Sequence, residues 1–367
     1  MKKIFLFLAL ALLLSACSRQ PETLTIGWIG TLTGDLSIVG IENQHGVELA
    51  LDEINTAGGI RGKPVRVVFE NDEGRVPTGL NAFSKLVDQD KAQHVLLSTY
   101  GVSLAAASVA QNSGVLAIGS LDASEELAQA GDWLLAIGIY DESLGQAQAE
   151  FVAENLGEKT AAVLFSTADP FALLSAEAFK KRFSELGGTT IQENYGAGDT
   201  DFRSQLLKIK SSPAKALVVV GWDESGLAVK QAKELGLDMP IIGIDTVPSV
   251  GFQKNAGDAS EGMYYTSWES SDPGLKEKVV EAYRKKYGSG PEQLLFVAAG
   301  YDAMHILAKA IQETDGSPEA VRYWLLNMKD YFGLMGSLTM SPDGIVRTVK
   351  ERVFQWKNGE GVAVGSQ

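Results

Sequence analysis

From residue 24 onward, short apolar segments alternate with longer segments whose apolar residues recur at helical spacing. This alternation constrains the fold more than any other feature of the chain. Strands that alternate with helices of about 10 to 15 residues form right-handed βαβ units and parallel sheets. The pattern runs twice, first over residues 24–118 and again over residues 161–244. It predicts two doubly wound lobes, each with a parallel sheet at its centre.

Particular segments are expected to form the strands and helices of these lobes. Gly58 and Gly59 end the first helix, because glycine supplies the left-handed conformation that closes a helix. The expected strands cover residues 24–29, 65–69, 95–97, 115–118, 161–165, 189–193, 216–220 and 241–244. The expected helices cover residues 46–55, 80–87, 104–111, 173–186, 202–209 and 227–235.

The two lobes are not expected to be consecutive in the sequence. Residues 136–140 and 265–269 are extended and lack helical periodicity, as chain crossings between lobes would. Helices expected at residues 275–287 and 294–311 follow without intervening strands, so they need an existing sheet to cover, and the first lobe is the natural host. A third crossing near residues 334–340 then returns the chain to the second lobe.

These crossings set the expected domain boundaries. The first lobe comprises residues 24–137 and 267–333, and the second comprises residues 138–266 and 334–367, where a strand over residues 352–356 joins its sheet. Three crossings form a hinge, which allows two rigid lobes to close on a molecule between them. The expected fold class is therefore α/β, with two doubly wound parallel-sheet lobes joined by a three-crossing hinge.

The N-terminus has the pattern of an export signal. Lys2 and Lys3 precede an unbroken apolar run over residues 4–14, and its 11 residues are too few to span a bilayer. The run is followed by Ser-Ala-Cys, and residues 14–17 resemble a bacterial lipobox, in which the cysteine thiol is acylated.

This resemblance predicts an exported bacterial lipoprotein. A signal peptide is expected over residues 1–16, with lipidation at Cys17 and a lipid-anchored tether over residues 17–23. The protein would then be anchored to a membrane in the periplasm or at the cell surface. An ordinary signal peptide with a chance cysteine is the alternative.

Charge and the scarcity of thiols and imidazoles exclude several classes of function. The formal net charge is −14, from 46 acidic and 32 basic side chains, which argues against a broad basic face for nucleic acid. The single cysteine excludes an intrachain disulfide, a Cys-rich zinc site and paired-thiol redox chemistry. His45, His94 and His305 lack metal-ligand spacing, and the chain has no Gly-x-Ser-x-Gly, Walker or Gly-x-Gly-x-x-Gly motif. We expect no metal, no cofactor and no enzymatic activity.

An ordered series of short segments resembles a known family. Residues 25–35, Gly40 and residues 48–60 resemble the start of type I periplasmic solute-binding proteins of ABC transporters, and the closest group is the leucine/isoleucine/valine-binding branch. The likeness covers residues 24–356 in order, and it continues through residues 61–64, Asp72 and residues 198–202, 216–222 and 300–303.

The resemblance implies a function in transport. Such proteins capture a small polar solute, here an amino acid or a related amide or carboxylic compound, by closure of two lobes. We therefore expect a monomeric substrate-binding lipoprotein of an ABC importer that delivers its small-molecule ligand to the transmembrane subunits of a permease. Its membrane contact is the lipid at Cys17, and nucleic acid is not a partner. The alternative is a ligand-sensing extracytoplasmic protein that feeds a signalling or chemotaxis system.

By this resemblance, two loops of the first lobe hold the ligand. The Ser103 hydroxyl and nearby backbone N–H groups would bind a ligand carboxylate, although Ser103 as a simple helix cap is the alternative. Asp122 lies in the second loop, and its alternative role is to cap the short helical turn over residues 124–128. The first loop consists of Tyr100, Gly101, Val102 and Ser103, and the second contains Leu121, Asp122 and Ala123.

The chain departs from the amino-acid binders at both loops. Such proteins commonly carry serine at the position of Gly101 and threonine at the position of Ala123, so both hydroxyls are missing here. Asp122 adds an anion nearby. A ligand carboxylate would then depend on backbone donors and Ser103, or the true ligand carries no carboxylate.

The second lobe supplies the remaining expected contacts. Asp245, followed by Thr246, aligns with the acidic residue that pairs with a ligand ammonium, and a turn residue after a strand is its alternative role. Trp222 and Phe171 would stack on the ligand, although plain core or surface positions are the alternative. Tyr140 lies at the first crossing, as a hinge or rim residue.

Overall fold

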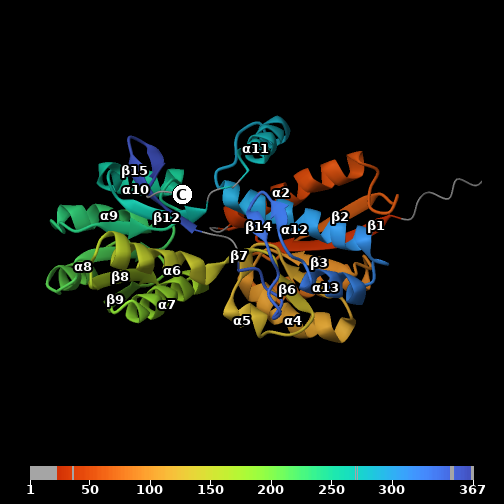
Figure 1. The fold of residues 1–367 in the computed structure, drawn as a ribbon, viewed down its shortest axis with the longest axis horizontal. Helices are drawn as coiled ribbons and strands as arrows, with labels where there is room; N and C mark the ends of the chain where they lie inside the picture. Colours follow the sequence, from red (N-terminus) through yellow and green to blue (C-terminus); the bar gives the residue numbers. More distant parts are fainter. Residues whose placement is uncertain (1–22, 35–36, 269, 271, 348–350, 365–367) are drawn as a thin grey trace, which may run out of the picture.

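The computed structural model describes residues 23–34, 37–268, 270, 272–347 and 351–364 of the 367-residue chain. The expected signal peptide, Cys17 and the tether up to residue 22 lie outside this described part. Within it, the chain forms two lobes that lie side by side and are joined by short segments (Figure 1).

Most elements of the first lobe precede residue 137, and the rest follow residue 272. They are β1 (Leu24–Gly30), α2 (Ser37–Thr56), β2 (Val65–Asn71), α3 (Val76–Asp88), β3 (His94–Leu97), α4 (Tyr100–Ser113), β4 (Leu116–Gly119), β5 (Asp122–Ala123), α5 (Glu125–Ala128), β6 (Leu134–Ala136), α11 (Pro273–Tyr287), α12 (Leu294–Glu313), α13 (Pro318–Leu326), β13 (Tyr331–Gly333) and β14 (Gly336–Leu338).

The second lobe takes up the chain between these two parts and then its final strands. Its elements are α6 (Asp141–Glu150), which continues as a π-helical turn (Phe151–Asn155), β8 (Thr160–Ser166), α7 (Pro170–Glu185), β9 (Thr189–Tyr195), α8 (Arg203–Lys210), β10 (Ala216–Val220), α9 (Ser225–Glu234), β11 (Ile241–Gly243), α10 (Val250–Ala256), a 3₁₀ turn (Gly257–Ser260), β12 (Tyr264–Trp268), β15 (Glu351–Lys357) and β16 (Glu360–Ala363). Strand β7 (Ile139–Tyr140) lies at the first crossing.

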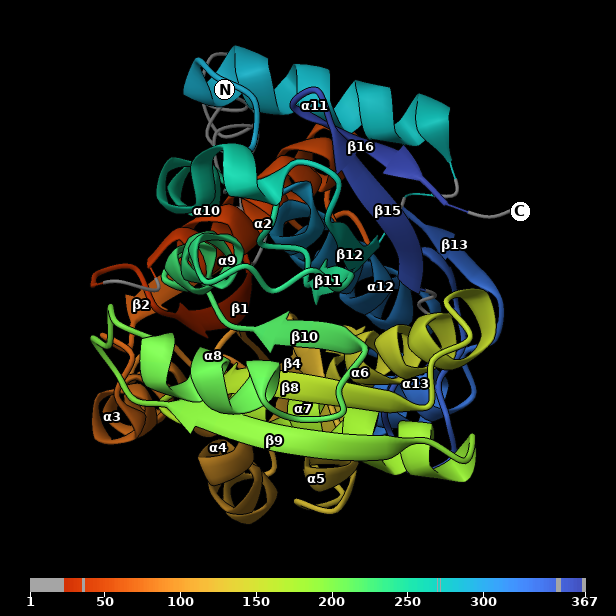
Figure 2. The same ribbon diagram turned by 90° about the vertical axis from the view of Figure 1, so that its left-hand side faces the viewer.

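Each lobe is built around one main sheet. The first sheet has the strand order β2-β1-β3-β4-β6, with all neighbouring strands parallel. The second has the order β16-β15-β12-β11-β10-β8-β9, in which β15 pairs antiparallel with both β12 and β16 and the other neighbouring strands are parallel (Figure 2). The prediction of an α/β fold with two doubly wound parallel-sheet lobes is confirmed.

Both faces of each sheet are buried, as a doubly wound fold requires. In β8, Leu164 packs with α8 and α9 on one face, whereas Val163 packs with α6 and α7 on the other. Successive side chains of a strand point to opposite faces, so the apolar runs read from the sequence cover both faces at once.

Helix α12 forms the centre of the first lobe and packs closely along α2. A Cβ atom on Gly46 would lie 2.1 Å from the carbonyl oxygen of Val297, and one on Gly300 would lie 2.1 Å from that of Asn43. Glycine at these two positions therefore lets the helix backbones touch. Among the described helices, α12 alone has the length and apolar character of a membrane span, but 83% of its apolar window is buried inside this lobe.

The third crossing lies later than expected. The hairpin β13–β14 packs on the first lobe, because the buried carboxylate of Asp302 accepts hydrogen bonds from the backbone N–H groups of Leu334 (2.8 Å) and Met335 (2.7 Å). The backbone N–H of Val346 also bonds to the carbonyl oxygen of Ala136 at 2.9 Å. The predicted crossing near residues 334–340, and the assignment of residues 334–346 to the second lobe, are therefore wrong.

The second crossing differs from the prediction in a similar way. Residues 265–269 are expected to be a connection, but β12 pairs with β11 at residues 264–265 and with β15 over residues 264–268, so its backbone belongs to the second sheet. The Trp268 side chain nevertheless packs in the core of the first lobe and donates Nε1–H to the carbonyl oxygen of Met335 at 3.1 Å. This residue thus joins the two lobes.

Candidate functional site

A cavity of about 400 Å³ lies at the seam between the lobes, and we call it the seam cavity. Its walls come from segments that directly follow strands at the carboxyl edges of both sheets. Thr31 follows β1 and Thr99 follows β3 in the first lobe, whereas Trp222 follows β10 and Asp245 follows β11 in the second. Ligands of open parallel sheets bind at this edge.

The structure brings most of the sequence-predicted site residues to this place. Tyr100, Gly101, Leu121, Asp122, Phe171, Trp222 and Asp245 all line the seam cavity. Thr246 instead lines a neighbouring cavity of about 550 Å³, which shares Asp169, Trp222 and Phe296 with the seam cavity.

Besides Thr246, four predicted residues do not line the seam cavity, namely Val102, Ser103, Ala123 and Tyr140. The predicted loop at residues 100–103 is the first turn of α4, so the Ser103 hydroxyl donates to the carbonyl oxygen of Thr99 (3.1 Å) within the helix. Val102 and Ala123 are buried in the apolar core of the first lobe. Tyr140 lies at the crossing and donates its hydroxyl to Glu125 Oε1 at 2.7 Å.

Asp122 has a different role from the helix cap that we considered. The Oγ of Ser124 accepts the backbone N–H of Leu127 at 3.1 Å, so Ser124 caps α5. Asp122 lies in β5, which pairs with β7 at the first crossing, and its side chain faces the seam cavity. Because side chains alternate along a strand, its neighbour Ala123 faces the core.

Sequence reasoning missed several residues of the site. Asp141 begins α6 and lines the seam cavity, as does Phe296 at the start of α12. Asp169 also lines it, and the Asp-Pro pair at residues 169–170 is a helix-start signal that could have revealed its position. No comparable signal in the sequence marks Asp141.

Trp222 and Asp169 are fixed by contacts with each other and with neighbouring aromatic rings. The Trp222 indole Nε1–H donates to Asp169 Oδ2 at 2.5 Å, while Asp169 Oδ1 accepts the backbone N–H of Phe171 at 3.0 Å. The Trp222 ring lies 6.2 Å from the ring of Phe171 and 6.5 Å from that of Phe296, measured between centroids. Since Phe296 belongs to the first lobe, Trp222 contacts both lobes.

Two hydroxyls of the first lobe point to a buried carboxylate. Thr31 Oγ1 donates to Asp72 Oδ1 at 2.8 Å, and Thr99 Oγ1 donates to Asp72 Oδ2 at 2.5 Å. Because these hydroxyl protons are directed at Asp72, the two oxygen atoms present lone pairs to any other partner. This wall of the seam cavity therefore favours hydrogen-bond donors.

The electrostatics of the seam cavity are acidic. Burial, with a smaller contribution from the charge of Asp169, raises the pKa of Asp122 to about 7. Burial also raises the pKa of Asp141 well above its ordinary value, and the charges of Asp122, Glu142 and Asp169 add to this effect. The pKa of Asp245 is raised to about 6, again by burial. Such carboxyl groups take up a cation readily, because a cation offsets the cost of ionising them.

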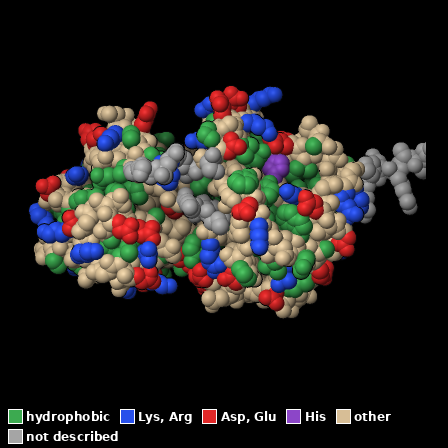
Figure 3. Space-filling view, viewed as in Figure 1, with side chains coloured by type: hydrophobic (Ala, Val, Ile, Leu, Met, Phe, Trp, Pro, Cys, Tyr) green, Lys and Arg blue, Asp and Glu red, His purple; other side chains and the backbone are tan. Residues whose placement is uncertain are grey.

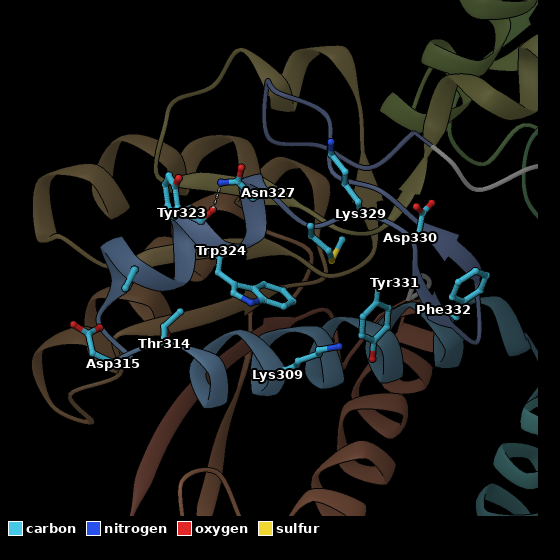
Figure 4. Close-up of a pocket in the computed structure, with 12 residues that line it drawn as sticks. Lys309, Thr314, Asp315, Tyr323, Trp324, Asn327, Lys329, Asp330, Tyr331 and Phe332 are labelled. Carbon is cyan, nitrogen blue, oxygen red and sulfur yellow. Dashed lines mark hydrogen bonds between the residues drawn. The ribbon is translucent and has the colours of Figure 1, made fainter.

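Other features of the surface do not form a comparable site. The described residues contain no group of three or more side chains that could hold a metal ion. A wider groove of about 970 Å³ lies between α12, α13 and the β13–β14 hairpin (Figure 4). It is lined by the first lobe only and holds exposed Tyr323 and Phe332. Acidic and basic side chains are interspersed on the face in Figure 3, without a broad basic area.

Comparison with known proteins decides the family. The family model described as periplasmic binding protein matches residues 23–360. The chain belongs to this family. Its members are substrate-binding proteins of transport systems, so the prediction that the chain is not an enzyme is confirmed.

This chain matches its relatives over nearly their whole length. The chain is 28% identical to the leucine-, isoleucine-, valine-, threonine-, and alanine-binding protein of Pseudomonas aeruginosa, over 96% of this chain and 95% of that protein. It is 25% identical to Leu/Ile/Val-binding protein homolog 3 of Brucella melitensis, over 99% of both. The crystal structure of the branched-chain amino acid transporter substrate binding protein LivJ from Streptococcus pneumoniae, in complex with isoleucine, matches with a TM-score of 0.81, 29% identity and coverage of 94% and 99%. The resemblance to the leucine/isoleucine/valine-binding group is thus confirmed.

Proposed function

We propose that this chain is the solute receptor of an ABC importer, which closes its two lobes over a small solute and delivers it to a permease. The observation that carries the proposal is the seam cavity, which is lined by both lobes at the carboxyl edges of both sheets. A solute bound there touches both lobes at once, so its binding energy favours the closed arrangement.

We further propose that the solute carries an amino group, as an amino acid or the amide of an amino acid would. Asp245 and the donor-accepting wall formed by Thr31 and Thr99 suit such a group. The names of the similar proteins, which include leucine and isoleucine binding, support this class of solute. The Ser103 hydroxyl was expected to bind a ligand carboxylate. That contact is not part of the proposal, because the hydroxyl is hydrogen-bonded within α4.

A ligand screen by thermal shift tests the proposed function. A solute held at 100 times its dissociation constant should stabilise the folded chain by about 2.7 kcal/mol. Small-angle scattering of the same sample should show a more compact molecule once the solute is bound. If stabilising solutes leave the scattering unchanged, the two lobes do not close and the proposed mechanism is wrong.

We also propose that the protein is exported, acts as a monomer and is held at a membrane by a lipid on Cys17. Replacing Cys17 by serine should move the protein from the membrane fraction to the soluble fraction, because the acylated thiol is its anchor. Fractionation of cells that express either chain measures this. A Cys17→Ser protein that stays in the membrane fraction would contradict the lipid anchor.

A further inference from the structure

The seam cavity holds an excess of negative charge. Four aspartates line it, namely Asp122, Asp141, Asp169 and Asp245, whereas no lysine, arginine or histidine is among its described lining residues. A single ammonium group would need only one of these carboxylates as its partner. The other acidic side chains therefore require an explanation.

Asp141 is the clearest case. Its side chain lines the seam cavity and is only 2% exposed, yet its Oδ2 atom has no hydrogen-bond partner. Its place at the start of α6 favours a negative charge through the helix dipole. The helix dipole does not provide Oδ2 with a hydrogen-bond donor. A buried ionised carboxylate without such a partner is costly in free energy. A cation bound beside Asp141 in the cavity would offset that cost.

The charged groups near Asp141 do not include such a cation. Asp122, Glu142 and Asp169 act on it, and all three are acidic. The nearby guanidinium of Arg347 is engaged elsewhere, since it forms ion pairs with Glu125 and Asp343 at 3.0 and 2.7 Å.

The acidic groups of the cavity differ in the neighbouring charges that act on them. Asp122 and Asp141 act on each other and make one pair. Asp169 lies near them, but both of its oxygens already accept hydrogen bonds, so it serves to hold Trp222. The charge of Asp245 instead acts on Glu351. The apolar rings of Phe171, Trp222 and Phe296 line the same cavity and can enclose an aliphatic chain.

We propose that the solute carries two cationic groups, with one ammonium or guanidinium at Asp245 and the other at the Asp122–Asp141 pair. Basic amino acids and aliphatic diamines share this chemistry. This inference rests on the proposed function and narrows the solute to molecules of net positive charge or with a second amino group.

Three compounds with related skeletons test the inference by titration calorimetry on the full chain. They are lysine, norleucine, which lacks the side-chain ammonium, and 1,5-diaminopentane, which lacks the carboxylate. We expect lysine, 1,5-diaminopentane or both to bind at least about 30-fold more tightly than norleucine, as expected for a buried charge pair. Tighter binding of lysine than of 1,5-diaminopentane would show that the site also recognises a carboxylate, and the reverse order would show that it does not.

Variants locate the second cationic group. Asp141→Asn should weaken binding of the preferred dication about 30-fold or more. Asp122→Asn should also lower the affinity for that dication. Asp132→Asn is the matched control, because the Asp132 side chain is 87% exposed and does not line the cavity. Thermal melts confirm that each variant folds, and because two different aspartates are tested, one misfolded variant does not end the test.

Two results would overturn the inference. One is binding of norleucine, leucine or isoleucine as tight as that of the two dications. The other is unchanged dication affinity in both Asp141→Asn and Asp122→Asn. Either result leaves the proposed solute receptor standing if lobe closure is observed, whereas a receptor that closes on no solute would refute the proposed function itself.

Discussion

Replacing Asp245 by asparagine should remove the ionic partner of a ligand ammonium while keeping the shape of the side chain. Asp245 lies just after β11 and lines the seam cavity. Loss of one partner from a buried charge pair costs about 2 to 5 kcal/mol, which corresponds to at least about a 30-fold weaker affinity. The fold should remain stable, because the substitution removes a buried charge and leaves none unpaired.

The pKa of Asp245 makes the same prediction testable through pH. With a pKa of about 6, raised by burial, this carboxyl group is about 97% ionised at pH 7.5 and about 9% ionised at pH 5. Only the ionised form pairs with an ammonium, so this group alone weakens binding about tenfold between these pH values. Glu351 faces Asp245, accepts a hydrogen bond from Ser143, and has its pKa raised to about 8 by burial and by the Asp245 charge. Asp122, with a pKa of about 7, shifts the affinity in the same direction.

Titration calorimetry of the tightest-binding amine, at pH 7.5 and pH 5, measures both effects. The native chain should lose affinity by tenfold or more on acidification, and Asp245→Asn should lose about tenfold less. Equal affinity of the two proteins at pH 7.5 would refute the pairing of Asp245 with the ligand. An identical pH dependence in both proteins would show that another group accounts for the titration.

Substitutions at three further positions test the site and the fold. Trp222→Ala removes the indole that borders both cavities and contacts Phe296, so solute affinity should fall about tenfold or more in calorimetry; unchanged affinity would contradict its place in the site. Gly300→Val places a side chain against the Asn43 carbonyl and should lower the unfolding free energy by about 3 kcal/mol or more, whereas a native melting temperature would contradict the close contact of α2 with α12. Asp302→Ala leaves two backbone N–H groups of the β13–β14 hairpin without an acceptor, so it should lower the free energy of unfolding, measured with denaturant, by about 2 to 4 kcal/mol. Asp302→Asn should lower it less, and equal losses in the two variants would contradict this role of Asp302.

Much of the fold could be predicted because it depends on local patterns. The alternation of strands and helices identified both sheets. Trp222 and Asp245 were expected in the site from the family resemblance, and they follow β10 and β11 and line the seam cavity. The bounds of the elements follow less directly from such patterns, because helix starts depend on caps. Helix α4 begins at Tyr100 and not at residue 104, which places Ser103 within the helix and removes its hydroxyl from the site.

The remaining errors concern contacts between distant parts of the chain. The β13–β14 hairpin belongs to the first lobe because of Asp302, which is about 30 residues away and has no local signal of that role. Asp141 reaches the seam cavity only because the first crossing brings the start of α6 beside β5. Such positions are set by contacts between segments that lie far apart in the chain, which local patterns in a single sequence do not specify.

The central claim, closure of the two lobes over a solute, is tested most directly by the distance between them. Cys17 is the only native cysteine, so a Cys17→Ser chain with cysteines introduced at the exposed positions Asp132 and Lys208 can carry one fluorophore on each lobe. Single-molecule energy transfer should then rise to a new, higher value when a solute that stabilises the protein is added. The same transfer efficiency with and without that solute would contradict closure.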